Sequence, residues 1–196
     1  MQDGINLMSD GVLPQHLGGH LNRTHTDRGT LKYLIQQYQI KSMVDIGCGT
    51  GQMVEIAQDR GLDVMGIDGD WFVMKAPHIN VMIHDFRDPI EISRTWDLAW
   101  AVEFLEHVEE KYMDNYMTVF NACKYAIVTH APPGHPGHHH VNCQDPEYWI
   151  EKFDKYNFDC DLTESVKIRQ HHATMLKPFM QKTGLFFKNR EFHDAT

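Results

Sequence analysis

VDIGCGTG, residues 44–51, is the most informative stretch of this chain. Its first three residues end a short apolar segment that we expect to be a buried strand. Gly47, Gly49 and Gly51 follow, and because glycine has no Cβ, the backbone can turn tightly there and approach a ligand. A helix begins near Met53, so the unpaired N–H groups of its first turn point into the same turn. These features predict a ligand-binding crevice at the carboxyl end of a parallel strand.

The spacing of the glycines separates two kinds of nucleotide site. A dinucleotide fold uses G-x-G-x-x-G, which faces a helix N-terminus toward a pyrophosphate. Here the spacing is G-x-G-x-G after Asp45, and an acid suits a ligand with an ammonium group and repels a phosphate. The string resembles motif I of the class I S-adenosylmethionine-dependent methyltransferases, written D-x-G-x-G-x-G. The resemblance implies S-adenosylmethionine as cofactor and S-adenosylhomocysteine as product.

The same resemblance implies roles for residues that follow later apolar segments. Asp68 would accept hydrogen bonds from both ribose hydroxyls. Asp85 would bond the adenine amino group, and Phe86 would pack on the ring. Without the resemblance, Asp68 could be a turn residue beside Gly69, and Asp85 a solvated side chain before a turn. The residues expected to bind the cofactor are Asp45, Gly47, Cys48, Gly49, Gly51, Asp68, Gly69, Asp85, Phe86 and Glu103.

Residues 103–108, EFLEHV, resemble the E-x-L-E-H-V segment that follows the fourth strand in small-molecule methyltransferases. If the segment is helical, Glu103, Glu106 and His107 lie on one face. That face could bind a divalent cation, act as an acid–base group or be structural. Some relatives, including ubiquinone-pathway O-methyltransferases and small-RNA 2′-O-methyltransferases, hold a metal with such a segment and a later histidine, whereas many others hold none. We expect no metal, although a divalent cation is an alternative, and take His107 as the first candidate base.

Residues 130–140, HAPPGHPGHHH, hold five of the fourteen histidines. Proline and glycine exclude a regular element, so we expect a loop at the carboxyl end of the fifth strand, on the substrate side. The loop could be merely solvated, or it could be a substrate wall in which His138, His139 or His140 acts as a catalytic base near neutral pH. A third alternative joins His139 or His140 to residues 103–107 in a metal site.

Length and composition limit the classes of partner. At 196 residues the chain can hold one domain with a full core, and its net charge is −9 with scattered lysines and arginines. A nucleic-acid substrate is therefore disfavoured, and a small molecule is favoured. No apolar run approaches the roughly 20 residues of a membrane helix, and the N-terminus does not resemble a secretory signal. The four cysteines are too sparse for a disulfide scaffold, so we expect a cytoplasmic protein, with no prediction of oligomeric state.

Short apolar segments alternate with helical patterns, which is typical of an α/β doubly wound fold. The resemblance implies a mostly parallel, seven-stranded, Rossmann-like sheet with a closing antiparallel strand. We expect a single methyltransferase domain over residues 1–196, in which residues 1–29 form an N-terminal arm or lid and Asp27 caps the first helix. Further strands are expected at 63–67, 81–83, 96–102, 125–129, 157–160 and 184–187, and helices at about 31–38, 53–60, 109–124, from 146, and through Val166, Ile168 and Met175 to Pro178.

The expected activity is in-line methyl transfer from S-adenosylmethionine to a small-molecule acceptor that bears a hydroxyl. The sulfonium leaves as a neutral thioether, so the protein mainly aligns the nucleophile, the methyl group and the sulfur. No N-P-P-Y-type string follows the fourth strand, which disfavours nitrogen methylation in nucleic acid or protein. The alternatives are a catalytically silent protein that binds the cofactor and a metal-assisted 2′-O-type methyltransferase acting on nucleic acid. A nicotinamide dehydrogenase would share the fold, but its glycine spacing differs.

Overall fold

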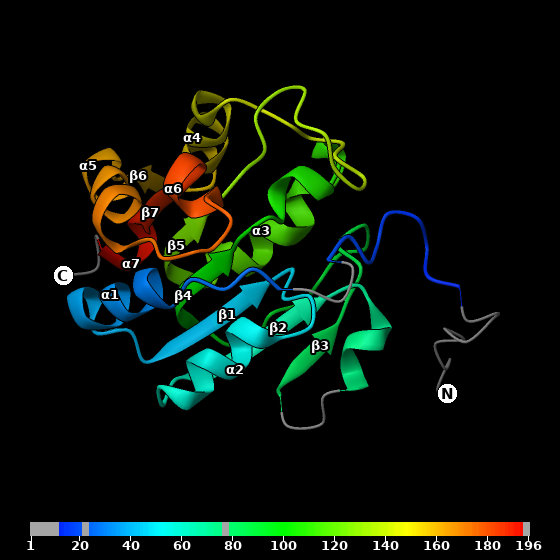
Figure 1. Ribbon diagram of the computed structural model, residues 1–196, viewed down its shortest axis with the longest axis horizontal. Helices are drawn as coiled ribbons and strands as arrows, with labels where there is room; N and C mark the ends of the chain where they lie inside the picture. Colours follow the sequence, from blue (N-terminus) through cyan, green and yellow to red (C-terminus); the bar gives the residue numbers. More distant parts are fainter. Residues whose placement is uncertain (1–11, 21–23, 76–78, 194–196) are drawn as a thin grey trace.

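A mixed seven-stranded sheet forms the centre of the described chain (Figure 1). The structure is a computed structural model that describes residues 12–20, 24–75 and 79–193. The strands follow the order β3-β2-β1-β4-β5-β7-β6, in which β7 runs antiparallel to both neighbours and the other pairs are parallel. The predicted doubly wound sheet with a closing antiparallel strand is confirmed. The strands are β1 (Ser42–Ile46), β2 (Asp63–Asp68), β3 (Val81–Ile83), β4 (Trp96–Ala101), β5 (Cys123–Val128), β6 (Phe158–Cys160) and β7 (Leu185–Asn189).

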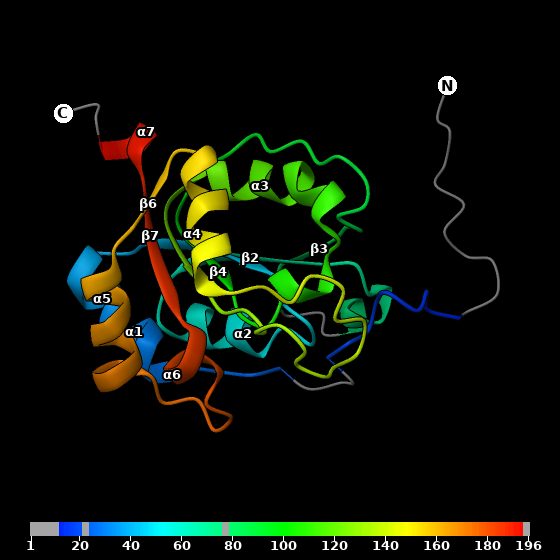
Figure 2. The same cartoon turned by 90° about the horizontal axis from the view of Figure 1, so that it is seen from above.

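Helices cover both faces of the sheet (Figure 2). Side chains of successive strand residues alternate between the faces, so Val44 and Ile46 enter one hydrophobic core and Met43 enters the other. Burial on both faces explains the short, almost continuous apolar runs of the central strands. One face holds α3 (Met113–Asn121) and α4 (Pro146–Lys155), and the other holds α1 (Arg28–Tyr38), α2 (Gln52–Asp59), α5 (Leu162–Lys167) and α6 (Phe179–Thr183), while α7 (Arg190–His193) follows β7.

The segment after β4 is not the helix that its spacing predicts. Glu103 has a left-handed backbone with φ 57°, and only η2 (Leu105–His107) forms a short 3-10 turn. The Glu103 N–H donates to Thr129 Oγ1 at 2.8 Å, so it does not enter a helical hydrogen bond. The expected common helical face of Glu103, Glu106 and His107 is therefore wrong, although the three residues remain close along the chain.

The helix expected to reach Pro178 is also wrong in its second half. α5 ends at Lys167 and passes into a π-helical turn, η4 (Ile168–His172). The N–H and hydroxyl of Thr174 both donate to Asp27 Oδ1, at 2.9 and 3.0 Å, so this N–H is not available to a continued helix. Asp27 also accepts the Thr30 N–H at 3.0 Å, which confirms the predicted cap of α1.

Further short helices appear where the sequence predicts none or a longer element. η1 (Trp71–Lys75) follows β2, and η3 (Glu110–Tyr112) precedes α3, so the helix expected from residue 109 begins as a 3-10 turn.

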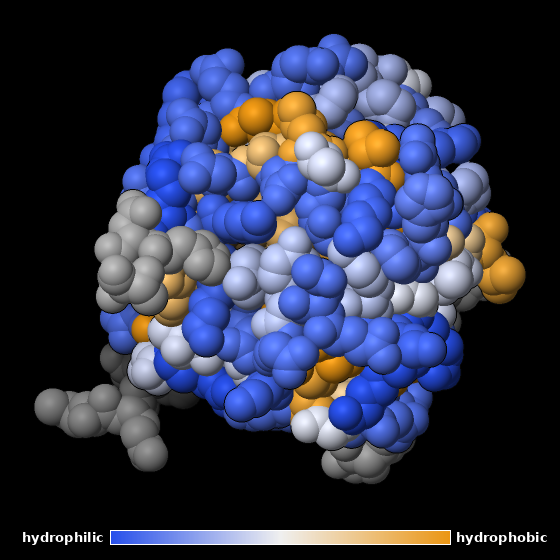
Figure 3. Space-filling model, turned by 90° about the vertical axis from the view of Figure 1, so that its left-hand side faces the viewer, coloured by the Kyte–Doolittle hydropathy of each residue, from blue (hydrophilic) through white to orange (hydrophobic). Residues whose placement is uncertain are grey.

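Among the described residues, no helix has the length and apolar composition needed to cross a membrane. The face seen in Figure 3 is mostly hydrophilic, with small separate hydrophobic patches. The four cysteines are free.

Candidate functional site

The glycine turn after β1 is held by the tip of β2. The Gly47 N–H and the next N–H in the chain donate to Ile67 O at 2.8 and 3.2 Å, and the Gly49 N–H donates to Asp68 Oδ2 at 2.7 Å. Gly47, Gly49 and Gly51 all have left-handed backbones, with φ of 74°, 52° and 79°. A Cβ on Gly47 would stand 2.6 Å from the Phe104 ring, so the turn requires glycine there for space as well as for conformation.

Two acids stand beside this turn, the buried Asp45 and the half-buried Asp68. Asp68 Oδ1 accepts the Asp70 N–H at 2.8 Å, so each carboxylate oxygen of Asp68 holds one backbone N–H and keeps a lone pair for a ligand hydroxyl. Burial raises the pKa of Asp68. Burial and then the neighbouring Asp68 raise the pKa of Asp45, which is 3% exposed, to about 8. The turn therefore holds carboxyl groups that would gain from a cationic ligand.

Asp85 and Phe86 follow β3, at the other end of the site. Asp85 Oδ2 accepts a hydrogen bond from His16 Nε2 at 2.8 Å, and Oδ1 accepts the Arg87 N–H at 3.0 Å. Burial opposes ionisation of Asp85, but these hydrogen bonds outweigh it and lower its pKa. The Phe86 ring is buried edge-on against Phe104, with ring centroids 5.3 Å apart. This end offers an ionised carboxylate beside an aromatic surface.

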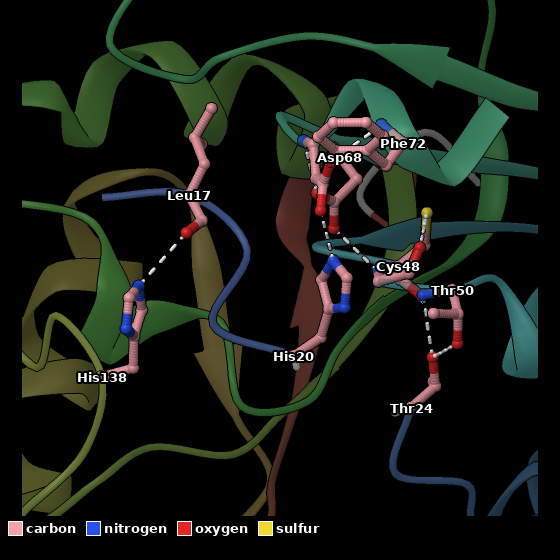
Figure 4. Close-up of polar contacts among 10 residues, drawn as sticks. Leu17, His20, Thr24, Cys48, Thr50, Asp68, Phe72 and His138 are labelled. Carbon is pink, nitrogen blue, oxygen red and sulfur yellow. Dashed lines mark hydrogen bonds and ion pairs between the residues drawn. The ribbon is translucent and has the colours of Figure 1, made fainter. Parts of the chain in front are cut away.

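The described part of the N-terminal arm lines the cavity and makes polar contacts with both sides of the site (Figure 4). His20 Nε2 donates to Asp70 Oδ2 at 2.9 Å, and Leu17 O accepts from His138 Nε2 at 3.1 Å. Farther along, the Thr24 and Thr50 hydroxyls are hydrogen bonded at 2.8 Å. Of the arm expected over residues 1–29, residues 1–11 and 21–23 lie outside the described residues. The described part joins the β2–β3 side of the site to the histidine-rich loop.

The opposite wall holds carboxyl and imidazole groups after β4. Burial raises the pKa of Glu103 to about 7, and burial together with the Glu103 charge raises the pKa of Glu106. Burial, followed by the neighbouring His140, lowers the pKa of His107 to about 4. The His107 imidazole is therefore neutral at pH 7, whereas Glu103 is near its midpoint.

Two histidines of this wall donate hydrogen bonds from Nδ1 to backbone carbonyls. His107 Nδ1 bonds to His138 O at 2.9 Å, and His140 Nδ1 bonds to His135 O at 3.0 Å. A carbonyl oxygen only accepts, so each Nδ1 carries a proton, and in the neutral His107 ring Nε2 keeps a lone pair. Ligand atoms of Glu106, His107 and His140 lie within 4.8 Å of one another. These three residues could hold a metal ion, whereas Glu103 and His139 are not part of the group.

Most of the predicted site residues line one cavity of about 360 Å³. They are Asp45, Gly47, Gly49, Asp68, Gly69, Asp85, Phe86, Glu103, His107, His138, His139 and His140. Cys48 and Gly51 do not line it: the Cys48 side chain is buried against Gly66, and Gly51 is the N-cap residue of α2. Cys48 and Gly51 therefore contribute the backbone of the turn rather than a ligand-facing surface.

The cavity has further walls that no motif indicates. His16 and His20 come from the arm, and Lys177 and Phe179 come from the chain around the start of α6. They are far along the chain from the glycine turn, so no spacing relates them to it. The histidines of the arm were the only sequence signal for this part of the site.

A family model matches part of the chain, and several solved methyltransferases share its fold. The methyltransferase domain family matches residues 44–124. The fold is similar to a TehB-like S-adenosylmethionine-dependent methyltransferase from Corynebacterium glutamicum (TM-score 0.59, 17% identity, 82% of this chain and 87% of that chain). It is also similar to the methyltransferase domain of bacterial CtHen1-C (0.57, 16%, 83% and 96%) and to magnesium protoporphyrin IX methyltransferase from Synechocystis with bound S-adenosylhomocysteine (0.54, 14%, 81% and 80%). Comparison with curated proteins gave no significant match.

Asp68→Asn should weaken the binding of S-adenosylhomocysteine by about 10- to 100-fold, because the ribose hydroxyls would lose a charged acceptor. Isothermal titration calorimetry of the wild type and the variant measures the change. Asp59→Asn, at an exposed position at the end of α2, is the matched control and should bind as the wild type does. Wild-type affinity in Asp68→Asn would contradict the ribose role.

Asp45→Asn should stabilise the ligand-free protein at pH 8 and have little effect near pH 4. The folded-state pKa of Asp45 is about 8, above its ordinary value of 3.8, so the folded protein holds the extra proton between these values. Its stability therefore falls as the pH rises through this window, and asparagine removes that dependence because it cannot ionise. Urea denaturation at both pH values measures the difference, and an equal effect at both would refute the raised pKa.

Proposed function

Because the chain is a class I S-adenosylmethionine-dependent methyltransferase, we propose that it methylates the hydroxyl oxygen of a small-molecule acceptor. The main support is that the arm and the histidine-rich loop line the same cavity as the residues assigned to the cofactor, so they bound the room that is left for an acceptor. The arm and the histidine-rich loop meet at the Leu17–His138 hydrogen bond. A cavity bounded by these two segments favours a small acceptor over a macromolecule.

The cofactor would lie along the tips of four adjacent strands. In this arrangement adenine contacts Asp85 and Phe86 after β3, and the ribose hydroxyls bond to Asp68 at the end of β2. The methionine part then lies over the glycine turn after β1, with its cationic groups near Asp45 and near Glu103 after β4. The order of these groups follows the order of the strands, so one extended ligand reaches all of them.

The acceptor would occupy the cavity beside the histidines. Its oxygen forms a bond to the methyl carbon as the bond from that carbon to sulfur breaks, and the hydroxyl proton passes to a nearby base. The Glu103 pKa of about 7 belongs to the empty cavity, and a carboxylate that faces the cations of the cofactor is not the base, so the candidate bases are His107 and the histidines of the loop. His107 offers a free Nε2, but its pKa of about 4 makes it a weaker proton acceptor than the sequence suggested.

The charges of the cavity also favour a small acceptor. Among the described residues that line it, Arg87 and Lys177 carry the permanent positive charges. The other titratable groups of its wall are carboxyl groups, imidazoles and the Tyr112 phenol. Nucleic-acid affinity depends on several lysine or arginine contacts to phosphates. A polyanionic acceptor would therefore find few partners here.

Metal-assisted transfer is a second candidate, favoured by the grouping of Glu106, His107 and His140. The Glu106 carboxylate is fully buried, and among the described residues neither oxygen has a hydrogen-bond partner. Together with Nε2 of His107 and of His140, this donor set fits a divalent ion such as Mn²⁺, Co²⁺ or Zn²⁺. Such an ion, when bound, would lower the pKa of the acceptor hydroxyl. In that case His107 would be a ligand rather than a base.

A panel of small hydroxyl compounds, with matched amines and short RNAs, should identify the acceptor class when S-adenosylhomocysteine release is followed. We expect turnover with hydroxyl compounds. His107→Asn should lower it by about 10²- to 10⁴-fold, since both candidate roles of His107 are lost, while cofactor affinity is retained. His171→Asn, an exposed position on η4, is the control. Turnover confined to amines or RNA would overturn the acceptor assignment.

Removal of divalent ions separates the two candidates. If the metal is required, dialysis against EDTA should abolish turnover and Mn²⁺ should restore it. Mn²⁺ should bind the wild type in a titration and bind Glu106→Gln and His140→Asn at least about tenfold more weakly, because each substitution removes a ligand. His171→Asn again serves as the control. Full activity after EDTA treatment, with no Mn²⁺ binding, would leave the acid–base candidate alone.

A further inference from the structure

Glu103 is held in an unusual backbone conformation at the edge of the cavity. Its φ of 57° lies in the left-handed region, which residues other than glycine adopt infrequently. Such conformations persist only where surrounding contacts impose them. Glu103 also lines the cavity, so the contacts that impose this conformation set where its carboxylate stands.

Thr129 supplies those contacts. The Glu103 N–H donates to Thr129 Oγ1 at 2.8 Å, and the Thr129 hydroxyl donates to Glu103 Oε1 at 3.1 Å. One hydroxyl therefore fixes both the backbone and the side chain of the same residue. Thr129 is itself fully buried, and its N–H donates to Ala101 O at 3.1 Å, which continues the pairing of β4 with β5 by one residue. The pairing of β4 with β5 at the centre of the sheet therefore sets the position of Thr129 and of its two hydrogen bonds to Glu103.

The strand order indicates which part of the cofactor this carboxylate faces. The acids beside β2 and β3 lie on one side of the glycine turn, and Glu103, after β4, lies on the other side. An extended S-adenosylmethionine with its adenosine on the β2–β3 side has its ammonium and sulfonium groups toward β4. A carboxylate is the group that would favour these two cations.

We propose that Thr129 is a positioning residue for the cofactor, because its hydroxyl holds the Glu103 carboxylate toward the cationic methionine end of S-adenosylmethionine. This role concerns cofactor affinity and does not depend on the identity of the acceptor. It predicts a charge-dependent effect: the methyl donor carries a sulfonium that S-adenosylhomocysteine lacks. Loss of the two hydrogen bonds between Thr129 and Glu103 should therefore weaken binding of S-adenosylmethionine more than binding of S-adenosylhomocysteine.

Calorimetric titration of both compounds tests this role. Thr129→Val removes the hydroxyl while keeping the shape, and should weaken S-adenosylmethionine by about 5- to 10-fold and S-adenosylhomocysteine by about twofold or less. Thr129→Ser keeps the hydroxyl and should restore most of the donor affinity. Thr30→Val is the matched control, because Thr30 is fully buried and its hydroxyl has no partner among the described residues.

Glu103→Gln keeps the test decisive even if Thr129→Val folds poorly. This variant should also weaken the donor more than the product, and adding Thr129→Val to it should cause no further loss, since both changes act through one carboxylate. Equal weakening of both compounds, additive losses in the double variant or unchanged donor affinity in Glu103→Gln would each overturn the role. These outcomes leave the hydroxyl-acceptor proposal untouched, because no acceptor is present.

Discussion

The hydrogen bond from the Gly49 N–H to the Asp68 carboxylate joins the glycine turn of β1 to the tip of β2. It couples the backbone of the turn to the direction of the carboxylate, the two features that the proposed cofactor site requires. The arm depends on the same point, because a Cβ on Gly49 would stand 3.2 Å from both His20 and Thr24. A small residue at this position therefore permits both the ligand crevice and its cover.

The electrostatics of the two ends of the crevice differ for a physical reason. Asp85, near the expected adenine, is hydrogen bonded by His16 and Arg87 and has a lowered pKa. Asp45, which is buried, and Glu103, which is half-buried, lie near the expected methionine with few donors and have raised pKa values. Carboxyl groups that hold protons when the crevice is empty can ionise when a cation arrives. The methionine end is thus suited to a ligand that brings positive charge.

The acceptor side is built from parts of the chain that share no local pattern. The arm, the loop before α4 and the segment around Lys177 converge on one cavity. The similar solved structures share the fold at 14–17% identity, and a fold of this kind supports different acceptors because its loops differ. We therefore expect these three segments, rather than the sheet, to set the choice of acceptor.

The sequence by itself determined the glycine turn, the acids at the strand tips and the strand–helix alternation, because each depends on residues within a few positions of one another. Only the tertiary structure decided that Glu103 leaves the helix and bonds to Thr129 and that His107 meets His140. It also decided that the helical segment ends at His172 instead of reaching Pro178, since the bonds of Thr174 to Asp27 compete with a longer helix. Contacts between residues far apart in the chain outweigh local helical preference, and a local sequence pattern does not predict these contacts.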